Sequence, residues 1–398
     1  MSTQNEIVTL NGQAQTADVF AQMSWFSRPK VEQATVMVVG CGALGNEVLK
    51  NLALFGVGHI VVVDFDQVEP HNLTRSVLFR MEDAQQRRKK VAVVAQRIRQ
   101  LNPAVEVTVL DADITWQVGL GWFLQSDVVI GCLDNRWARY VLNRLAMRAG
   151  VPWVDGGIEG LQGVAKVFIP GQNCYACTMD PAAFAQMRQR VSCAATLRRN
   201  EATNHITTTP IVASIIGAVQ AQEALKLIHA EKLASGQLTS LCGKMFYYEG
   251  EHLTSRLVEH KAWDNDCPVH DVWTPTHQSN ITPQFTVAET LQTLSTLLQA
   301  EQVEIILHNF CWVQFIERKT DGLVVPVELP DTLVGDFVET HPDLKHTLAG
   351  DMYQREWHSI DNTFPNQQIT LAQIGIPDKD VIHVSTPQGD FYVALTQK

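Results

Sequence analysis

The stretch that decides the fold is Val36-Met37-Val38-Val39-Gly40-Cys41-Gly42-Ala43-Leu44-Gly45, an apolar strand that runs directly into a glycine-rich turn. A second apolar run ends on Asp64-Phe65-Asp66, and six residues later comes Asn72-Leu73-Thr74-Arg75. A strand, a glycine turn and a helix in this order are typical of nucleotide-binding folds, because the turn and the helix N-terminus present backbone N–H groups to phosphate. The glycine string alone is a weak signal, since proteins that bind NAD or flavin share it.

The residues after the turn distinguish between nucleotides. Asp64 lies 19 residues after Gly45, where a ribose-binding carboxylate is expected. A dinucleotide enzyme has no need of a second Asp and an Asn-x-x-Arg after it. A site that works on the α-phosphate of ATP does need cationic and amide donors beside the turn. The sequence therefore predicts an ATP-using adenylating site, and the alternative is a tight turn without a ligand.

Two further motifs complete the pattern: Lys90 at the end of a basic run, and Asp134-Asn135 after a later strand. The set resembles the ThiF/MoeB-type and ubiquitin-activating (E1-type) superfamily over about residues 35–270. Ser76 is a departure, because the family usually has Gln after the arginine. The resemblance implies ATP and Mg²⁺ as cofactors, with Arg75 and Lys90 as catalytic cations at the phosphates. The residues it implies at the nucleotide are Gly40, Gly42, Gly45, Asp64, Asp66, Asn72, Arg75, Lys90 and Asp134, the last of them beside magnesium.

Several of these residues have ordinary alternatives. Asp66 is expected to orient the loop with Asn72 and Arg75, or else to be a surface carboxylate. Only the resemblance selects Lys90 from its basic neighbours. The alternative is that all four basic residues are exposed to solvent at the start of a helix. Asp134 can instead cap the next helix. Relatives also place an N-terminal arginine at the phosphates; Arg28 is the candidate, although it is closer to the turn than the family pattern has it.

Two short-spaced ligand pairs stand on separate loops, Cys174-x-x-Cys177 and Cys267-x-x-His270. This arrangement predicts a closed structural Zn²⁺ site, with a histidine where relatives usually have a fourth cysteine. Such a site would hold the loops together without taking part in catalysis. The alternative is an incidental Cys-x-x-Cys beside a free thiol and a surface histidine.

Cys193, in Ser192-Cys193-Ala194-Ala195-Thr196-Leu197, lies where enzymes that activate ubiquitin-like modifiers place their thioester cysteine. The run resembles the compact activating enzyme for the ubiquitin-fold modifier. Flanking cations would lower the pKa of the thiol and favour the nucleophilic thiolate; they are Arg188, Arg190, Arg198 and Arg199. The alternative is a structural thiol packed under the loop.

The predicted fold class is α/β: a Rossmann-like, doubly wound adenylation domain with a zinc-held loop region and a small C-terminal α+β domain. The expected divisions are a helical segment at 1–34, the adenylation domain with its cysteine-bearing segment at 35–270, a linker at 271–283, and the C-terminal domain at 284–398. Helices are expected over 45–55, 84–101, 136–149, 210–229 and 286–300. The sequence Thr370 to Val384 looks like the end of a β-grasp, ubiquitin-like fold, with a general accessory domain as the alternative.

Composition narrows the partners. With 45% apolar and 18% charged residues, the chain is ordinary for a globular protein. A net charge of −11 argues against nucleic acid, and no apolar run approaches the ~20 residues needed to span a membrane. The polar start lacks a signal-peptide core, so a cytoplasmic location is expected. Eight cysteines in such a chain favour metal ligation or catalysis over disulfides.

The resemblance implies an activating enzyme that adenylates the C-terminal glycine of a ubiquitin-like protein and forms a thioester on Cys193. It would then pass the acyl group to an E2-type conjugating enzyme through the C-terminal domain, and would work as a homodimer. In its length and its β-grasp-like C-terminal domain the chain resembles the stand-alone activating enzymes of bacterial ubiquitin-like operons, including the antiviral Bil type. Two alternatives remain: a ThiF/MoeB-type adenylyltransferase for a sulfur-carrier protein without a thioester step, and a non-catalytic adaptor.

Overall fold

The computed structural model describes residues 7–10, 13–17, 19–179, 208–260 and 263–396. The chain divides into two compact units. The first consists of Met1–Ile114, Phe123–Met179 and Ile206–Val272, and the second includes Thr115–Trp122 and Trp273–Lys398. The second unit therefore contains a segment from inside the predicted adenylation block, which sequence continuity alone does not reveal.

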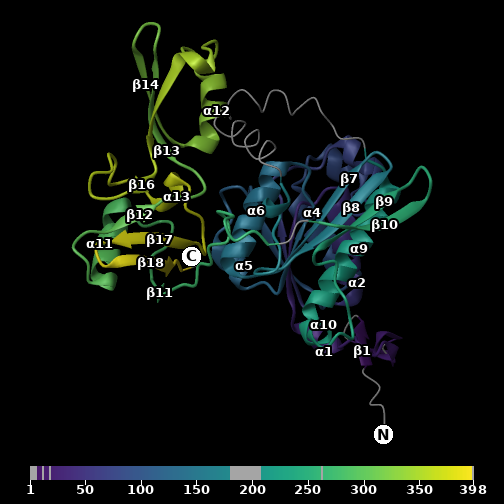
Figure 1. Ribbon diagram of the computed structural model, residues 1–398. Coiled ribbons are helices and arrows are strands. Elements are labelled where there is room, and N and C mark those ends of the chain that lie inside the picture. Colours follow the sequence, from purple (N-terminus) through teal and green to yellow (C-terminus); the bar gives the residue numbers. More distant parts are fainter. Residues whose placement is uncertain (1–6, 11–12, 18, 180–207, 261–262, 397–398) are drawn as a thin grey trace. The chain divides into compact units, whose positions relative to one another are not determined.

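An eight-stranded mixed sheet, in the order β10-β9-β8-β7-β6-β3-β4-β5, forms the centre of the first unit (Figure 1). Five neighbouring strands are parallel. The three in the middle, β4, β3 and β6, are nearly continuous apolar runs, as expected for strands covered on both faces. Three antiparallel strands extend the sheet beyond β7. The strands are β3 (Thr35–Val39), β4 (His59–Val63), β5 (Glu106–Leu110), β6 (Val128–Gly131), β7 (Trp153–Glu159), β8 (Gln162–Phe168), β9 (Lys244–Glu249) and β10 (Thr254–Glu259). The α/β class is confirmed.

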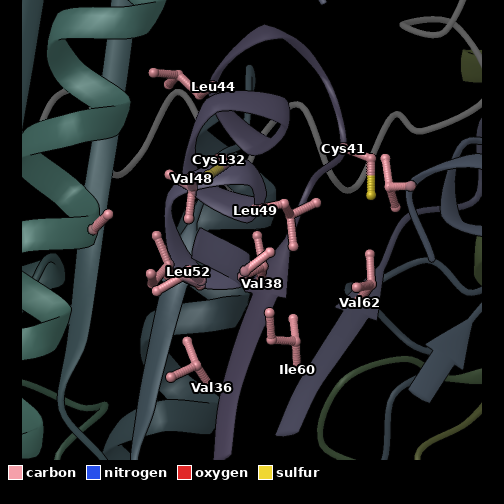
Figure 2. Close-up of a cluster of buried hydrophobic side chains, with 14 of the residues drawn as sticks. Val36, Val38, Cys41, Leu44, Val48, Leu49, Leu52, Ile60, Val62 and Cys132 are labelled. Carbon is pink, nitrogen blue, oxygen red and sulfur yellow. The ribbon is translucent and has the colours of Figure 1, made fainter. Parts of the chain in front are cut away.

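Helices cover both faces of this sheet. On one face α2 (Ala43–Phe55), α4 (Lys90–Leu101) and α9 (Pro210–Ile228) pack on alternate strand residues such as Val36, Val38, Ile60 and Val62 (Figure 2). On the other face α6 (Arg136–Ala149) packs against β6 and β7. The strand order reverses between β3 and β6, because β4 and β5 follow on one side and β7 on the other. That switch point is where ligands bind in folds of this kind.

Helix α9 is long and apolar enough, by length and composition alone, to cross a membrane, which corrects the expectation that no such run is present. In the structure 56% of this window is buried, and the helix contacts α2, β7 and β8. A core helix that is covered on several sides is apolar all round, because each of its faces contacts other apolar residues. Packing inside the first unit therefore explains the apolar composition of α9.

Two local predictions are wrong. Residues 7–17 form a hairpin of β1 (Ile7–Leu10) and β2 (Gln13–Ala17) instead of a helix, and β-branched residues in the first strand favour extended backbone. The helix expected over 84–101 is two helices, α3 (Met81–Gln85) and α4, separated at Arg87, whose φ is +48°. The remaining short helices are η1 (Val19–Gln22), α1 (Arg28–Gln33), η2 (Pro70–Thr74), α5 (Leu120–Leu124), η3 (Ala176–Thr178) and α10 (Ala230–Ala234).

The second unit has two small sheets. A five-stranded sheet in the order β11-β18-β17-β12-β16 packs its Ile and Val residues against α11, which begins at a Thr286–Glu289 capping box. A three-stranded sheet, β14-β13-β15, forms a separate core with α12. The elements are β11 (His277–Gln278), α11 (Val287–Leu298), β12 (Glu304–Ile306), β13 (Trp312–Arg318), β14 (Leu323–Pro330), α12 (Asp331–Thr340), η4 (Ala349–Asp351), β15 (Met352–Trp357), β16 (Ser359–Ile360), α13 (Leu371–Ile374), β17 (Val381–Thr386) and β18 (Gly389–Ala394).

The middle of this unit forms regular strands and a helix. Strand β14 reads Leu-Val-Val-Pro-Val-Glu-Leu-Pro, and its two prolines hide the strand pattern in the sequence. It lies at an edge of its sheet, where a missing N–H is tolerated. An α+β composition is observed, while the β-grasp assignment stays a prediction.

Candidate functional site

The glycine turn lies at the carboxyl end of β3, and its three glycines have different roles. A Cβ on Gly40, whose φ is +98°, would come 2.4 Å from the carbonyl oxygen of Cys132. A Cβ on Gly45 would come 1.9 Å from the carbonyl oxygen of Gly40. At Gly42, the N-cap of α2, an added Cβ meets nothing within 4 Å, and no side chain caps the helix. The turn therefore leaves the N-terminus of α2 open to an incoming group at Gly42.

Asp64 follows β4 and faces the turn. One carboxylate oxygen accepts a hydrogen bond from the Cys41 N–H at 2.7 Å, and the other accepts from the Asp66 N–H at 2.8 Å. Burial raises the pKa of Asp64, although the charge of Lys90 and the two backbone donors oppose that shift. The carboxylate thus stands beside the glycine turn, as a ribose-binding group in this fold must.

Lys90 is the first residue of α4, and its ammonium lies 2.8 Å from a carboxylate oxygen of Asp66. The side chain of Lys90 is 10% exposed and that of Asp66 is 51% exposed. Burial disfavours the charged amine, but Asp64 and Asp66 outweigh it and raise the pKa of Lys90. Asp66 therefore positions Lys90, which corrects the expectation that it orients the loop with Asn72 and Arg75.

The other cations of the basic run are engaged elsewhere. Arg88 binds Asp83, Arg87 donates to Gln67, and Lys89 pairs with Asp111 at 3.0 Å. Only Lys90 of these four reaches the two aspartates after β4, because the break at Arg87 turns the chain before α4 begins. The geometry thus selects Lys90 independently of the family pattern.

Asn72 and Arg75 lie in and just after η2. The Asn72 side chain closes this turn: its oxygen accepts from the Glu69 N–H at 2.9 Å, and its nitrogen is 3.0 Å from Nε2 of His71. Among the described residues, no hydrogen bond or ion pair engages the partly buried Arg75 side chain. The buried Ser76 hydroxyl likewise has no partner in the described part of the chain. Both groups are thus available to a ligand, whereas Asn72 already holds its own loop.

Asp134 stands at the end of the loop after β6, and its side chain is exposed. The cap of α6 is Asn135, whose side-chain oxygen accepts from the Ala138 N–H at 2.8 Å. The alternative role of Asp134 as the helix cap is therefore wrong. Its carboxylate remains at the same edge of the sheet as the glycine turn, because β6 is parallel to β3 and pairs with it.

Asn46 is a residue that the sequence analysis missed. Its buried amide donates to the carbonyl oxygens of Cys41 (2.7 Å) and Gly42 (3.0 Å), and its oxygen accepts from the Leu78 N–H at 2.8 Å. Asn46 thus ties the glycine turn to the segment that follows Arg75. A polar residue one position after the last glycine, inside an apolar helix, was the available signal.

Arg28 does not belong to the nucleotide site. It is buried in α1, donates to the Phe55 carbonyl at the end of α2, and lies over the rings of Phe20 and Phe26. Phe55 is at the opposite end of α2 from the glycine turn. A cation at a helix C-terminus stabilises the helix dipole, which explains the burial of Arg28 without a ligand.

The donor set fits ATP and a divalent cation. The open backbone at Gly42, the Ser76 hydroxyl and the cations of Arg75 and Lys90 suit phosphates, and Asp64 suits a ribose. Mg²⁺ keeps several waters, so a single exposed carboxylate such as Asp134 can suffice on the protein side.

The four predicted metal ligands come together in the first unit. The sulfurs of Cys174, Cys177 and Cys267 and the ring nitrogen of His270 all lie within 4.8 Å of one another. The distances are 3.1 Å for Cys174–Cys177, 3.9 Å for Cys174–Cys267 and 3.1 Å for His270 Nε2–Cys174. Tetrahedral zinc with Zn–S bonds of about 2.3 Å separates sulfurs by roughly 3.8 Å. We call these four side chains the metal cluster; it is compatible with zinc.

The thiols of the cluster titrate differently. The hydrogen bond between Cys174 and Cys267 lowers the pKa of Cys267 to about 6 and raises that of Cys174, and burial raises the pKa of Cys177. Burial lowers the pKa of His270, which keeps the imidazole neutral. Trp263 stacks on the His270 ring at 3.3 Å and fixes its plane. A thiolate and a neutral imidazole are the forms that bind zinc.

Cys193 lies outside the described residues, together with the four arginines around it. The remaining cysteines, Cys41, Cys132, Cys242 and Cys311, have pKa values raised chiefly by burial. None of these four described thiols is activated as a nucleophile.

In a comparison with known protein families, residues 15–269 of this chain match the ThiF family. The chain belongs to the ThiF family. This confirms the resemblance stated from the glycine turn, the two aspartates, Arg75, Lys90 and Asp134.

The relatives of this ThiF-family chain include a protein named as an E1 activating enzyme and a protein named as a sulfur-carrier adenylyltransferase. The SAMP-activating enzyme E1 of Haloferax volcanii is 32% identical over 59% of this chain and 79% of that enzyme. The sulfur carrier protein ThiS adenylyltransferase of Escherichia coli is 30% identical over 54% of this chain and 80% of that enzyme. Among solved structures, E. coli MccB with ATP superposes with a TM-score of 0.49 at 21% identity, covering 61% of this chain and 68% of MccB.

Proposed function

We propose that this protein is an ATP-dependent adenylyltransferase that activates the C-terminal carboxylate of a ubiquitin-like protein. The observation that carries the proposal is the convergence of an open glycine turn, Asp64 and the Asp66–Lys90 pair at one edge of the sheet. Family membership and the two named relatives support the same chemistry.

The proposed residues divide the work of one displacement. Asp64 would hold the ribose, and the N–H groups at Gly42 would hold the phosphates at the start of α2. The substrate carboxylate attacks the α-phosphorus, an acyl-phosphate bond forms, and pyrophosphate leaves. Negative charge increases on the α-phosphate and on the departing oxygen, so the fixed cations of Lys90 and Arg75 stabilise the transition state more than the ground state.

Asp134 would carry magnesium at the phosphates, and a bound magnesium ion would supply further neutralisation of phosphate charge. The metal cluster, which we propose to hold zinc, would keep the loops at Cys174 and Cys267 together. Asn46 would keep the turn and the Arg75 segment in register.

Pyrophosphate exchange tests the proposal. Purified full-length protein should convert labelled pyrophosphate into ATP only when a ubiquitin-like or sulfur-carrier protein with a free C-terminal glycine is present. The non-catalytic adaptor, the third possibility, predicts no exchange with any such protein. Absence of exchange together with absence of ATP binding would remove the proposal.

We further propose that the Cys193 thiolate attacks the acyl-adenylate, so that a thioester forms, the acyl–phosphate bond breaks and AMP leaves. The acyl group would then pass by thioester exchange to a cysteine of an E2-type enzyme, which the β-grasp-like C-terminal unit would recruit. We also propose that the enzyme works as a homodimer in the cytoplasm and that its gene belongs to a bacterial antiviral operon of the Bil type. A non-reducing gel tests the thioester: a thiol-sensitive adduct should form with wild type and be missing from Cys193→Ala. Persistence of the adduct in that variant would rule out Cys193.

The second candidate is adenylation of a sulfur-carrier protein without a thioester. It is favoured by the 80% of the E. coli ThiS adenylyltransferase that this chain covers. In that case pyrophosphate exchange would be normal in Cys193→Ala, and no thiol-sensitive adduct would form with wild type.

A further inference from the structure

The segment between β6 and α6 carries Asp134, and it is held from two sides. On the side of α6, Nη2 of Arg139 donates to the carbonyl oxygen of Leu133 at 2.6 Å and to that of Gly156 at 2.9 Å. Nε of Arg139 lies 3.0 Å from a carboxylate oxygen of Asp155, which keeps the guanidinium in place. Helix α9 covers the other face of the sheet, and none of its residues belongs to the nucleotide site described above.

Gln220 is the residue of α9 that reaches this segment, and it is fully buried. Its Nε2 donates to the Gly131 carbonyl oxygen at 2.9 Å, and its Oε1 accepts from the Cys132 sulfur at 3.9 Å. Gly131 is the last residue of β6, and Cys132 follows it directly. One amide group therefore binds two consecutive residues at the end of the strand that leads to Asp134.

The Gln220 amide has room at this place because Gly156 on β7 has no side chain. A Cβ on Gly156 would come 2.4 Å from the side-chain oxygen of Gln220. A glycine inside a strand often marks a place where the backbone is approached closely. One turn earlier on α9, a Cβ on Gly217 would come 2.7 Å from the Cβ of Glu47 on α2. These two glycines let α9 lie close enough to α2 and β7 for Gln220 to reach β6.

Cys132 also lies directly against the glycine turn. Its N–H donates to the Val39 carbonyl oxygen at 2.8 Å, and its own carbonyl oxygen would be 2.4 Å from a Cβ on Gly40. The end of β6 therefore lies between the glycine turn and Gln220. A shift of this strand end would move Asp134 relative to the turn, because a single residue separates Cys132 from Asp134.

The ionisable groups around Gln220 leave its amide to the end of β6. Glu223, one turn further along α9, pairs with Lys226, and Glu47 pairs with a lysine of its own helix. Burial raises the pKa of the Cys132 thiol, which stays a neutral donor toward Gln220. Within the described part of the chain, the Gln220 side chain hydrogen-bonds only with the two residues at the end of β6.

We propose that Gln220 is a positioning residue: it fixes the end of β6 against the glycine turn and so sets how tightly Asp134 holds the magnesium that accompanies ATP. Helix α9 then acts on the site through the strand end. This inference rests on the proposed function, because it requires Asp134 to serve the magnesium of a bound nucleotide.

The test uses the full-length protein and two variants of Gln220. Gln220→Met keeps the length of the side chain and removes both hydrogen bonds. ATP binding is measured by calorimetry across a series of magnesium chloride concentrations at about pH 8.5. The magnesium concentration for half-maximal ATP binding should rise roughly 3- to 10-fold, since groups one contact beyond a metal ligand change metal affinity by about 10- to 100-fold and Gln220 acts one contact further out. ATP binding without magnesium should not change.

Gln220→Glu makes a similar change in a reversible form. At about pH 8.5 its carboxylate cannot donate to the Gly131 carbonyl oxygen, so the magnesium requirement should rise as it does in Gln220→Met. Burial raises the pKa of a carboxyl group, so at about pH 5.5 this side chain is protonated and can donate again. The magnesium requirement should then return toward that of wild type at the same pH, whereas Gln220→Met should show no such recovery.

Gln222→Met is the matched control, because it makes the same substitution at an exposed position two residues further along α9. It should leave the magnesium requirement unchanged at both pH values. Thermal unfolding shows whether each variant is folded at the temperature of the titrations. If Gln220→Met does not fold, the recovery of Gln220→Glu at low pH decides the matter.

The outcomes separate the inference from the proposed function. If wild type binds Mg·ATP and the folded Gln220 variants need no more magnesium than wild type, the inference is wrong and the proposed function stands. An equal loss of ATP binding with and without magnesium, or a defect of Gln220→Glu that is the same at both pH values, would show a merely structural role and also overturn it. If wild type binds no ATP under any condition, both fail.

Discussion

At the scale of single residues, environment separates side chains that look alike in the sequence. Lys89 and Lys90 are neighbours in one basic run, yet Lys90 is buried against Asp66 while Lys89 pairs with Asp111 at the surface. A cation held between aspartates beside an open phosphate turn can stabilise developing charge, because it is oriented before the reaction. The exposed pair of Lys89 is worth little by comparison.

This difference predicts a large contrast between two single variants. Lys90→Ala should lower the rate of pyrophosphate exchange by about 100-fold or more, as is usual when a charge-stabilising donor is removed. Lys89→Ala, the matched control, should stay within roughly 3-fold of wild type. Exchange rates at saturating ATP measure both. Equal losses in the two variants would contradict the assignment of Lys90.

Asp331 provides a prediction about pH. Burial raises its pKa to about 6, even though the Cys311 N–H donates to its carboxylate at 3.3 Å. Because the folded state binds this proton more tightly than the unfolded chain, its contribution to stability is complete below about pH 4 and is lost as the pH rises through 6.

Asp331→Asn should therefore raise the unfolding temperature at pH 8, where the buried charge costs at most about 3 kcal/mol. It should have little effect near pH 4.5. Asp336→Asn, at an exposed position on the same helix, is the control and should not change the unfolding temperature at either pH. Thermal unfolding followed at both pH values decides the matter; a destabilised Asp331→Asn at pH 8 would count against the argument.

At the scale of elements, the strand–turn–helix unit of β3 and α2 shows how one short motif meets two requirements. Gly40 and Gly45 are needed by the fold, since a Cβ at either would overlap a backbone carbonyl. Gly42 is not needed by the fold, because an added methyl group there meets open space and its φ of −70° suits any residue. Its backbone is therefore free to face a phosphate.

Alanine substitutions in the turn should separate these roles. Gly45→Ala should lower the unfolding temperature strongly, because its Cβ would come 1.9 Å from the Gly40 carbonyl. Gly42→Ala should leave stability within about 1 kcal/mol of wild type and weaken ATP binding by at least about 10-fold. Calorimetric unfolding and ATP titration measure both effects. If Gly42→Ala bound ATP as tightly as wild type, the phosphates would not bind at Gly42 and the assignment would be wrong.

At the scale of the whole molecule, the second unit includes Thr115–Trp122, which the chain supplies between β5 and β6. Leu120 is 1% exposed and Trp122 is 8% exposed. The ammonium of Lys379 lies 3.8 Å from the centre of the Trp122 ring, and the Leu120 N–H donates to Asp380 at 3.0 Å. The second unit therefore includes two separate stretches of the chain.

Close backbone contact makes this segment testable. A Cβ on Gly119 would come 2.3 Å from the Asp378 carbonyl oxygen, so Gly119→Ala should loosen the segment. Hydrogen exchange should then accelerate at residues 378–382. Gly350→Ala, in the same unit but with open space around its Cβ, should leave exchange unchanged. Protection that is identical in Gly119→Ala and wild type would mean that this contact is not maintained.

Sequence alone determined the α/β class and predicted most of the candidate nucleotide site, because glycine turns, strand-end carboxylates and short-spaced metal ligands are local patterns whose combination is specific. The Gly40–Gly45 turn, Asp64, Lys90 and the four ligands of the metal cluster all lie where such patterns place them. The hairpin at residues 7–17 could also have been found locally, since an Asn-Gly pair lies between its strands in the sequence.

Only the tertiary structure decided which of several similar groups act together. It paired Asp66 with Lys90, placed Arg28 at the far end of α2 from the glycine turn, revealed the role of Asn46, and placed Arg139 beside Asp155. It also assigned Thr115–Trp122 to the second unit. These relations join residues far apart in the chain, and their energies come from burial and from charges brought within a few ångströms, which no local pattern records.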